Sequence, residues 1–169
     1  MPSVFRRPLL VASAALAAAL ARPAAAQELG LALGTRAPAA AVETLDGRPA
    51  DLAAVAARGP VLMEFWATWC PNCKALEPQM KQLAARYAGR LRLVGVAVSV
   101  NQSPERVKAY AAKYQLPLEL YYDRAGKATA AYDVPATSYV VVLDRAGKVV
   151  YTGQGAEQNL DAAVRQALR

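Results

Sequence analysis

Two cysteines, Cys70 and Cys73, are the residues of this chain best suited to covalent chemistry, and only Pro71 and Asn72 separate them. A disulfide that closes so short a loop restricts the unfolded chain very little, so it would add little stability as a permanent cross-link. A thiolate can, however, attack a disulfide to form a mixed disulfide, which a second nearby thiol resolves. The spacing therefore predicts a redox-active disulfide that is made and broken during function.

Histidine is absent from the 169 residues. This absence excludes His-dependent catalytic triads, His-ligated zinc or copper, and haem held by histidine. Structural zinc needs four ligands, and two thiols could hold it only in a site shared between chains. We therefore expect no metal site and no cofactor beyond the disulfide itself.

A strand and a helix must position the cysteines. Apolar residues on both faces predict a buried strand over 61–66, and apolar residues at three- and four-residue steps predict a helix over 70–88, kinked at Pro78. Cys70 then lies at the amino end of the helix, where unpaired amides and a partial positive charge stabilise a thiolate. We expect Cys70 to be the nucleophile and Cys73, one turn further on, to be the resolving thiol.

Glu64 is the only charged residue of the predicted strand 61–66. A carboxyl group buried behind the cysteines would have a pKa raised by desolvation, so it could exchange a proton with Cys73 near neutral pH. The alternative is a partly hydrated glutamate that pairs with Lys74 or another base. The spacing favours the catalytic interpretation.

The rest of the chain alternates strands with helices and ends in a hairpin and a helix. Asp51 and Ser103 are expected to cap the helices that follow them. This order predicts one α/β domain over 37–169, a three-layer sandwich with a central mixed sheet flanked by helices. Residues 27–36 show no clear period and are expected to be a loosely held, flexible lead-in. The predicted strands cover 40–44, 91–100, 118–122, 139–143 and 149–152, and the predicted helices cover 52–57, 103–114, 127–132 and 160–168.

The first 26 residues have the pattern of a secretory signal peptide. Arg6 and Arg7 form a basic segment, residues 9–21 form an apolar segment of 13 residues, and three alanines ending at Ala26 form a small-residue cleavage site. The apolar segment is shorter than the roughly 20 residues that a membrane-spanning helix needs. We therefore predict cleavage after Ala26 and export to the periplasm or otherwise out of the cytoplasm.

The chain is basic, with 20 Lys and Arg residues against 13 Asp and Glu residues and a net charge of +7. Without residues 1–26 there are 17 basic and 13 acidic residues, and the net charge is +4. The basic residues are scattered along the chain and do not interleave with aromatic residues, as nucleic-acid-binding surfaces often require. We therefore expect no nucleic-acid partner.

The sequence resembles the thioredoxin superfamily over residues 35–169. The resemblance depends on Phe-Trp-Ala-Thr-Trp-Cys-Pro-Asn-Cys-Lys at 65–74, on the acid six residues before the first cysteine, and on Pro78. The export signal and the Asp-Arg-Ala-Gly turn at 144–147 are similar to the TlpA and ResA branch of extracytoplasmic thiol-disulfide reductases. This resemblance implies a thioredoxin-like fold and protein-disulfide reductase activity. It extends to reductases of cytochrome c biogenesis, although the loop glutamate expected of these is absent.

The resemblance also implies partners and substrate contacts. The partners would be disulfide-bearing extracytoplasmic proteins, with a membrane thiol carrier as electron donor, and we expect a monomer. The family places a cis-proline opposite the cysteines, and counting back from the turn at 144–147 puts Ser138 at this position. Pro135 lies three residues earlier, so either the loop is re-registered around Pro135 or Ser138 replaces the proline, and the count favours Ser138. Three further substrate-binding candidates flank the thiols: Trp69, Pro71 and Asn72.

An exported thiol-disulfide oxidoreductase that works as a reductase is the leading hypothesis. An oxidase or isomerase of the same fold is the first alternative, because it differs in redox potential rather than in architecture. The second alternative is a module that holds copper(I) between the two thiolates, since copper(I) prefers soft sulfur ligands. The absence of histidine argues against similarity to copper-assembly proteins that pair two cysteines with one histidine.

Overall fold

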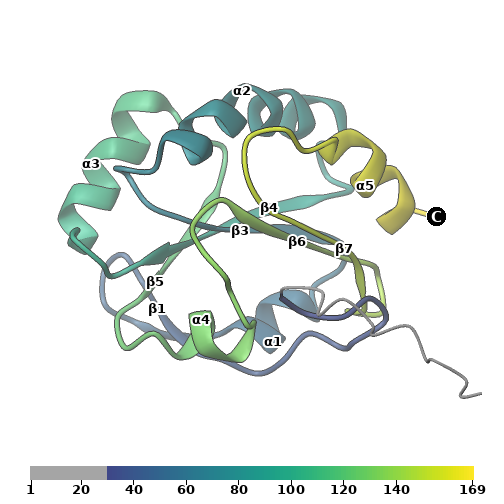
Figure 1. The fold of residues 1–169 in the computed structure, drawn as a ribbon, viewed down its shortest axis with the longest axis horizontal. Coiled ribbons are helices and arrows are strands. Elements are labelled where there is room, and N and C mark those ends of the chain that lie inside the picture. The colour runs from purple at the N-terminus through teal and green to yellow at the C-terminus, as the bar shows by residue number, and fades with distance from the viewer. Residues whose placement is uncertain (1–29) are drawn as a thin grey trace, which may run out of the picture.

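A single mixed sheet forms the centre of the molecule in the computed structural model, which describes residues 30–169. The predicted signal peptide, its cleavage site and residues 27–29 lie outside the described residues. Seven strands are arranged in the order β2-β1-β5-β4-β3-β6-β7. Helices α2, α3 and α5 cover one face of the sheet, and α1 and α4 cover the other (Figure 1). The predicted three-layer α/β sandwich is therefore confirmed.

Strands and helices follow one another along the chain much as predicted. The strands are β1 (Ala41–Thr44), β2 (Pro49–Asp51), β3 (Val61–Trp66), β4 (Arg92–Val98), β5 (Glu119–Asp123), β6 (Tyr139–Leu143) and β7 (Val149–Gly153). The helices are α1 (Leu52–Ala56), α2 (Pro71–Arg86), α3 (Pro104–Tyr114), α4 (Lys127–Ala131) and α5 (Leu160–Ala167).

Strand β3 lies at the centre of the sheet and is buried along its whole length. It pairs in parallel with β4 and antiparallel with β6. Because successive side chains point to opposite faces, Phe65 packs on the side of α1 and α4, while Leu62 packs against α2 and α5. Helices on both faces explain why the strand has a continuous apolar sequence apart from Glu64.

Side-chain caps begin two of the helices as predicted. Asp51 accepts hydrogen bonds from the backbone N–H groups of Ala53 and Ala54 at the start of α1. Ser103 accepts one from Arg106, with proline as the first residue of α3.

Strand β2 was not predicted, because three residues that include a proline are too short to show an alternating pattern.

The expected kink of α2 and the expected flexibility of the lead-in both stay predictions. Helix α2 continues through Pro78 without interruption of the helical assignment, and the kink there stays a prediction. The loosely held, flexible lead-in also stays a prediction; in its described part Gly34 N–H donates to the Val149 carbonyl and Val149 N–H donates to the Thr35 carbonyl. These bonds form because β7 is the last strand of the sheet and leaves backbone groups free to pair.

No helix within residues 30–169 has both the length and the apolar character that crossing a membrane requires.

Loss of the Asp51 cap should destabilise the fold. Asp51→Ala removes the acceptor for two backbone N–H groups of α1, so we expect the free energy of unfolding to fall by about 1 kcal/mol in urea titrations. Glu157→Ala is the control, because Glu157 is exposed and makes no side-chain hydrogen bond recorded within residues 30–169. Equal stability of the two variants would contradict the capping role.

Candidate active site

Cys70 and Cys73 form a disulfide at the amino end of α2, with their Cα atoms 5.3 Å apart. Cys70 is the N-cap residue, and its Sγ accepts a hydrogen bond from the Cys73 N–H at 3.1 Å. Pro71 follows as the first helical residue, where its missing N–H costs no helical hydrogen bond. The cap geometry directs the positive end of the helix dipole at the Cys70 sulfur.

The two cysteines are buried, whereas the residues predicted to contact substrate surround them on the surface. Cys70 and Cys73 are each 3% exposed, and Trp69 is 39% exposed. Pro71 and Asn72 are also exposed. The indole and the first turn of α2 are thus the exposed surface around the disulfide, and the contacts of these three residues with substrate stay a prediction.

Gln102, a residue that the sequence did not single out, holds the turn that carries the cysteines. Its Oε1 accepts a hydrogen bond from Thr68 N–H at 2.9 Å, while its Nε2 donates to the Val98 carbonyl at 2.6 Å. Trp69 Nε1 donates to the Val100 carbonyl at 2.8 Å. These bonds fix the segment before Cys70 against the β4–α3 loop. No single-sequence pattern distinguishes such a glutamine from any other loop residue.

A cavity of about 460 Å³ opens beside Trp69, between the β4–α3 loop and the segment from α4 to β6. Its walls are mainly apolar, with two acidic residues, Asp123 and Asp133, at its edge. A cavity of this size next to an exposed indole suits an apolar side chain of a bound protein segment. Its apolar lining includes Val98, Val100, Ala130, Val134 and Ala136.

Glu64 lies inside the protein on the face of β3 that α2 and α3 cover. It is 3% exposed, and its Oε1 has no hydrogen-bond partner. Burial, and then the negative charge of Glu77, raise the pKa of Glu64 from 4.5 to about 8. The alternative pairing of Glu64 with Lys74 or another base is not seen, since Lys74 is exposed and no ion pair within residues 30–169 includes either residue.

Ser138, rather than Pro135, lies next to the end of β3 that leads to the cysteines. Its N–H donates to the Phe65 carbonyl at 2.9 Å, its Oγ accepts from the Gly155 N–H, and its carbonyl accepts from Gln158. Ser138 is fully buried with φ +65°, whereas Pro135 is exposed. All peptide bonds within residues 30–169 are trans. Because every polar group of Ser138 is already bonded within the protein, its role in substrate binding stays a prediction, as does that of Pro135.

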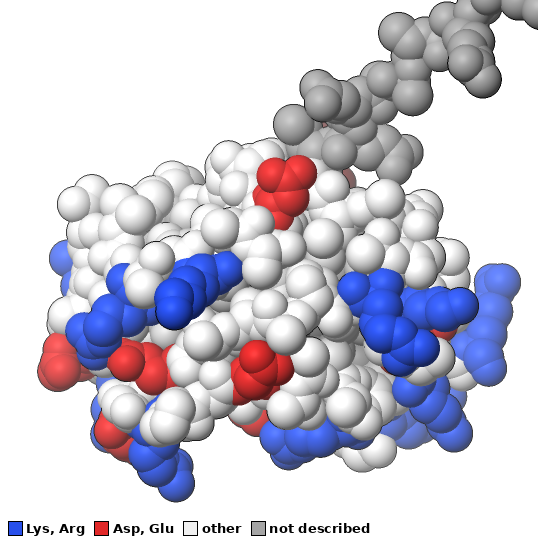
Figure 2. Space-filling view, turned by 90° about the horizontal axis from the view of Figure 1, so that it is seen from below, with Lys and Arg blue, Asp and Glu red and all other residues white. Residues whose placement is uncertain are grey.

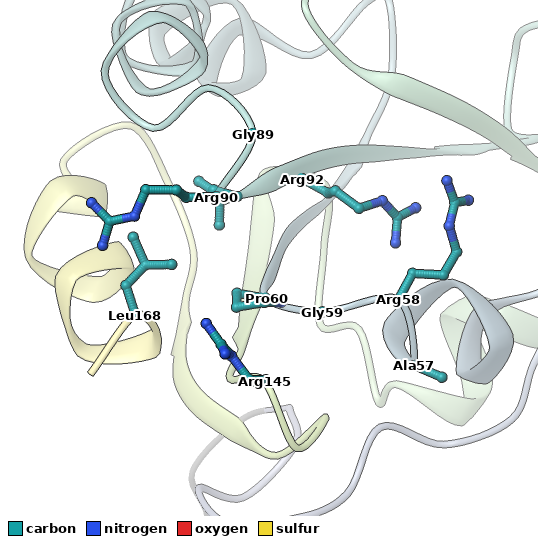
Figure 3. Close-up of a pocket in the computed structure, with 10 residues that line it drawn as sticks. Ala57, Arg58, Gly59, Pro60, Gly89, Arg90, Arg92, Arg145 and Leu168 are labelled. Atoms are coloured by element: carbon teal, nitrogen blue, oxygen red, sulfur yellow. The ribbon is translucent and has the colours of Figure 1, made fainter.

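A larger cavity, of about 630 Å³, lies at the opposite end of the sheet, near the amino ends of β3 and β4. Four arginines surround it, and Figure 3 shows two near each other on one side and two near Leu168 on the other. Arg58 and Arg92 both pair with Glu119, whereas no salt bridge within residues 30–169 includes Arg90 or Arg145. The fold therefore gathers basic residues that are scattered in the sequence, at a place remote from the thiols.

Basic residues do not form one continuous surface on the side of α1 and α4. Figure 2 shows Lys and Arg in separate groups toward two sides of this face, with acidic residues among them and mainly uncharged surface between. The chain also holds no cluster of three or more Cys, Asp or Glu suited to a metal ion within residues 30–169.

These features, a disulfide between residues three apart at a helix amino end and a sheet of this topology, define a thiol-disulfide oxidoreductase of the thioredoxin superfamily. The chain belongs to the Redoxin family, which it matches over residues 32–168. Relatives named as thiol-disulfide oxidoreductases support protein-disulfide oxidoreductase activity and an interaction with disulfide-bearing substrate proteins.

Two relatives are similar to the chain over most of their length. Thioredoxin-like protein YneN of Bacillus subtilis is 32% identical over 142 residues, which are 80% of this chain and 82% of YneN. Thiol-disulfide oxidoreductase ResA of Bacillus cereus is 26% identical over 147 residues, which are 87% of this chain and 84% of ResA. The TlpA- and ResA-like resemblance read from the sequence is therefore confirmed.

Solved structures agree with this assignment. A putative thiol:disulfide interchange protein DsbE from Chlorobium tepidum superposes with a TM-score of 0.70 at 27% identity, covering 82% of this chain and 99% of that one. A secreted disulfide oxidoreductase of Mycobacterium tuberculosis, homologous to DsbE, has a TM-score of 0.63 at 28% identity and covers 75% of this chain and 94% of that one. The thioredoxin-like fold is thus shared with proteins of thiol-disulfide chemistry.

The buried Glu64 should make the stability of the oxidised protein depend on pH. From pH 4.5 to about 8 the folded state keeps a proton on Glu64 that the unfolded state has lost, so the free energy of unfolding falls as pH rises through this window. The total decrease in the free energy of unfolding over this pH window is on the order of 4–5 kcal/mol. Glu64→Gln should remove this slope in urea titrations at pH 5 and pH 8. Parallel pH profiles for the variant and the wild type would rule out a buried proton at Glu64.

A proline at position 138 should destabilise the loop before β6. Ser138→Pro removes the N–H that bonds to Phe65 and requires a φ near −65°, whereas Ser138 has +65°. We expect the free energy of unfolding to fall by more than about 1 kcal/mol in urea titrations. Pro135→Ala, at an exposed position, is the control and should have a smaller effect. A Ser138→Pro variant as stable as the wild type would show that the loop can re-register around a proline.

Proposed function

We propose that this protein is an exported reductase of disulfides in extracytoplasmic proteins. The observation that carries the proposal is the arrangement of the Cys70–Cys73 pair, buried at the amino end of α2, with an exposed indole beside it and a neutral carboxyl group in the sheet below. The signal-like residues 1–26 support export, as does the similarity to a secreted oxidoreductase. A membrane thiol carrier would return electrons to the pair after each turnover.

The reduced pair would act in two displacement steps. The Cys70 thiolate attacks one sulfur of the partner's disulfide, so that a bond from Cys70 to the partner forms and the partner's own S–S bond breaks. The released sulfur takes up a proton. Cys73 then loses its proton and attacks the Cys70 sulfur, which re-forms the internal disulfide and frees the partner as a dithiol. The pair thus gives two electrons to the partner, and each of the two sulfurs that leave as thiolates takes up a proton from solvent.

Glu64 would accept the proton of Cys73. A pKa of about 8 leaves both protonation states of Glu64 populated near neutral pH, which suits a group that takes up and returns a proton. Glu64 lies on the same face of β3 as Trp66, and Trp66 packs in the same buried cluster as Cys73. The Cys73 thiol and the carboxyl group thus occupy the same region beneath α2.

The surroundings of Cys73 favour a reductant over an oxidant. Strong oxidants of this fold owe their high potential to a stabilised reduced form, in which the thiolate is favoured. Here Cys73 is buried, and the acid beneath it becomes negative when it ionises, so a second thiolate is disfavoured. A Cys73 thiolate would therefore add little to the stability of the reduced form, and this supports the assignment as a reductant.

The assignment is tested by a redox titration together with an insulin-reduction assay. We expect a potential close to ~−270 mV, as for reductants of this fold, rather than ~−120 mV. Cys70→Ser should abolish turnover because it removes the nucleophile. Cys73→Ser should instead accumulate a mixed disulfide with the partner, visible by mass, because the second step cannot occur.

The alternatives give different results in the same experiments. A potential near ~−120 mV with disulfide formation in a reduced substrate would indicate an oxidase. Retention of one copper(I) ion per chain after dialysis, with no reduction of insulin by the pre-reduced protein, would indicate a copper-binding module. A Cys70→Ser,Cys73→Ser double variant controls for reduction by any other group.

A further inference from the structure

A second carboxylate lies beside the dithiol. Glu77 follows Cys73 by four residues on α2, so the two side chains lie on the same side of the helix. Glu77 is partly buried, and the Tyr110 hydroxyl of α3 donates a hydrogen bond to its Oε1 at 2.6 Å. The only carboxylate of α2 is therefore held in place by a neighbouring helix instead of extending into solvent.

Tyr110 connects this carboxylate to the strand that carries Glu64. The ring of Tyr110 packs against the ring of Trp66 with centroids 5.8 Å apart. Trp66 lies two residues after Glu64 on β3, so both side chains point to the face that α2 and α3 cover. Glu64, Trp66, Tyr110 and Glu77 thus come from three elements that meet over one region of the sheet.

The charges of these groups act on one another. The negative charge of Glu77 is the cause, after burial, that raises the pKa of Glu64. Burial, and then the hydrogen bond and charge of Glu77, raise the pKa of Tyr110, and the charge of Glu64 adds to this effect. The strand neighbours of Glu64 in register, Gly95 and Val140, do not titrate. The acids and the phenol therefore form one electrostatically coupled group next to Cys73.

Two buried polar atoms in this region have no partner within the protein. They are Oε1 of Glu64 and Nε1 of Trp66, and each could bind a water molecule. Gly95 pairs with Glu64 in the sheet, and a Cβ at this position would lie 2.8 Å from Trp66 Nε1. A side chain at position 95 would therefore crowd the indole N–H, so glycine leaves room for the indole.

We propose that Glu77, oriented by Tyr110, is a positioning residue for Glu64: its negative charge favours proton uptake by Glu64, and it passes that proton between the buried site and solvent. Glu64 alone is too buried to exchange a proton directly with bulk water, whereas Glu77 is partly exposed and one turn from Cys73. A water molecule on Glu64 Oε1 would complete the path. The inference depends on the proposed proton transfer between Cys73 and Glu64.

The test compares Glu77→Gln with the wild type in two measurements. The first is the titration of the Glu64 carboxyl group, followed by carbon NMR in the oxidised protein. We expect Glu77→Gln to move the Glu64 pKa down toward its ordinary value, because a like charge has been removed. The second is the pH profile of insulin reduction, where we expect turnover near pH 7 to slow by about tenfold, less than the ~10²-fold or greater effect of losing a direct proton-transfer group.

Two further variants separate charge from orientation. Glu77→Asp keeps the charge and should restore most of the upward shift of the Glu64 pKa. Tyr110→Phe keeps the ring against Trp66 but removes the hydrogen bond to Glu77, so it should slow turnover while the Glu64 titration stays close to that of the wild type. Glu157→Gln, on the exposed surface, is the control for removing one negative charge and should change neither measurement.

The outcomes distinguish this inference from the proposed function. An unchanged Glu64 titration in Glu77→Gln overturns the inference, even if turnover is impaired, because a merely structural defect would explain the loss. If Glu64→Gln changes the pH profile but Glu77→Gln does not, the inference fails and the function of Glu64 stands. If Glu64→Gln itself has the wild-type profile, the proton transfer to Glu64 fails, and the inference fails with it.

Discussion

The hydrogen bond from the Cys73 N–H to Cys70 Sγ is the contact on which the rest of the site depends. It makes a sulfur atom the cap of α2, so the sulfur satisfies a helix amide and lies at the positive end of the helix dipole. The bond forms because Cys70 keeps an extended backbone while the helix begins at Pro71, shortly after β3 ends at Trp66. Gln102 stabilises that turn from the β4–α3 loop. The reactivity of one thiol is therefore a property of a strand, a loop and a helix together.

The same burial that stabilises the central strand creates the acid–base chemistry of the site. Helices cover both faces of β3, and Glu64 is the only ionisable residue of this strand. Removal from water raises its pKa to about 8, so an ordinary carboxylic acid acquires a proton that it can exchange at neutral pH. The free energy lost by burying an acid is offset by the apolar packing around it.

The parallel pairing of β3 with β4 places the thiols and a group of arginines at opposite edges of the sheet. The carboxyl ends of parallel strands share one edge of a sheet, which brings the cysteine turn next to the loop that carries Val100 and Gln102. The amino ends share the other edge, where arginines from the α1–β3, α2–β4 and β6–β7 connections meet. Charges that look dispersed along the chain are thus gathered by topology, at a distance from the apolar surroundings of the thiols.

Local patterns in the sequence determined the element types, two of the helix caps, the redox-active pair and the presence of one acid in a buried strand. These features depend on neighbours within a few residues, so periodicity and spacing reveal them. Only the tertiary structure decided that Gln102 holds the cysteine turn, that the lead-in pairs with β7, that the polar groups of Ser138 bond within the protein, and that Tyr110 bonds to Glu77 and packs on Trp66. Each of these depends on contacts between residues far apart in the chain, and long-range packing sets such contacts without leaving a periodic signal in one sequence.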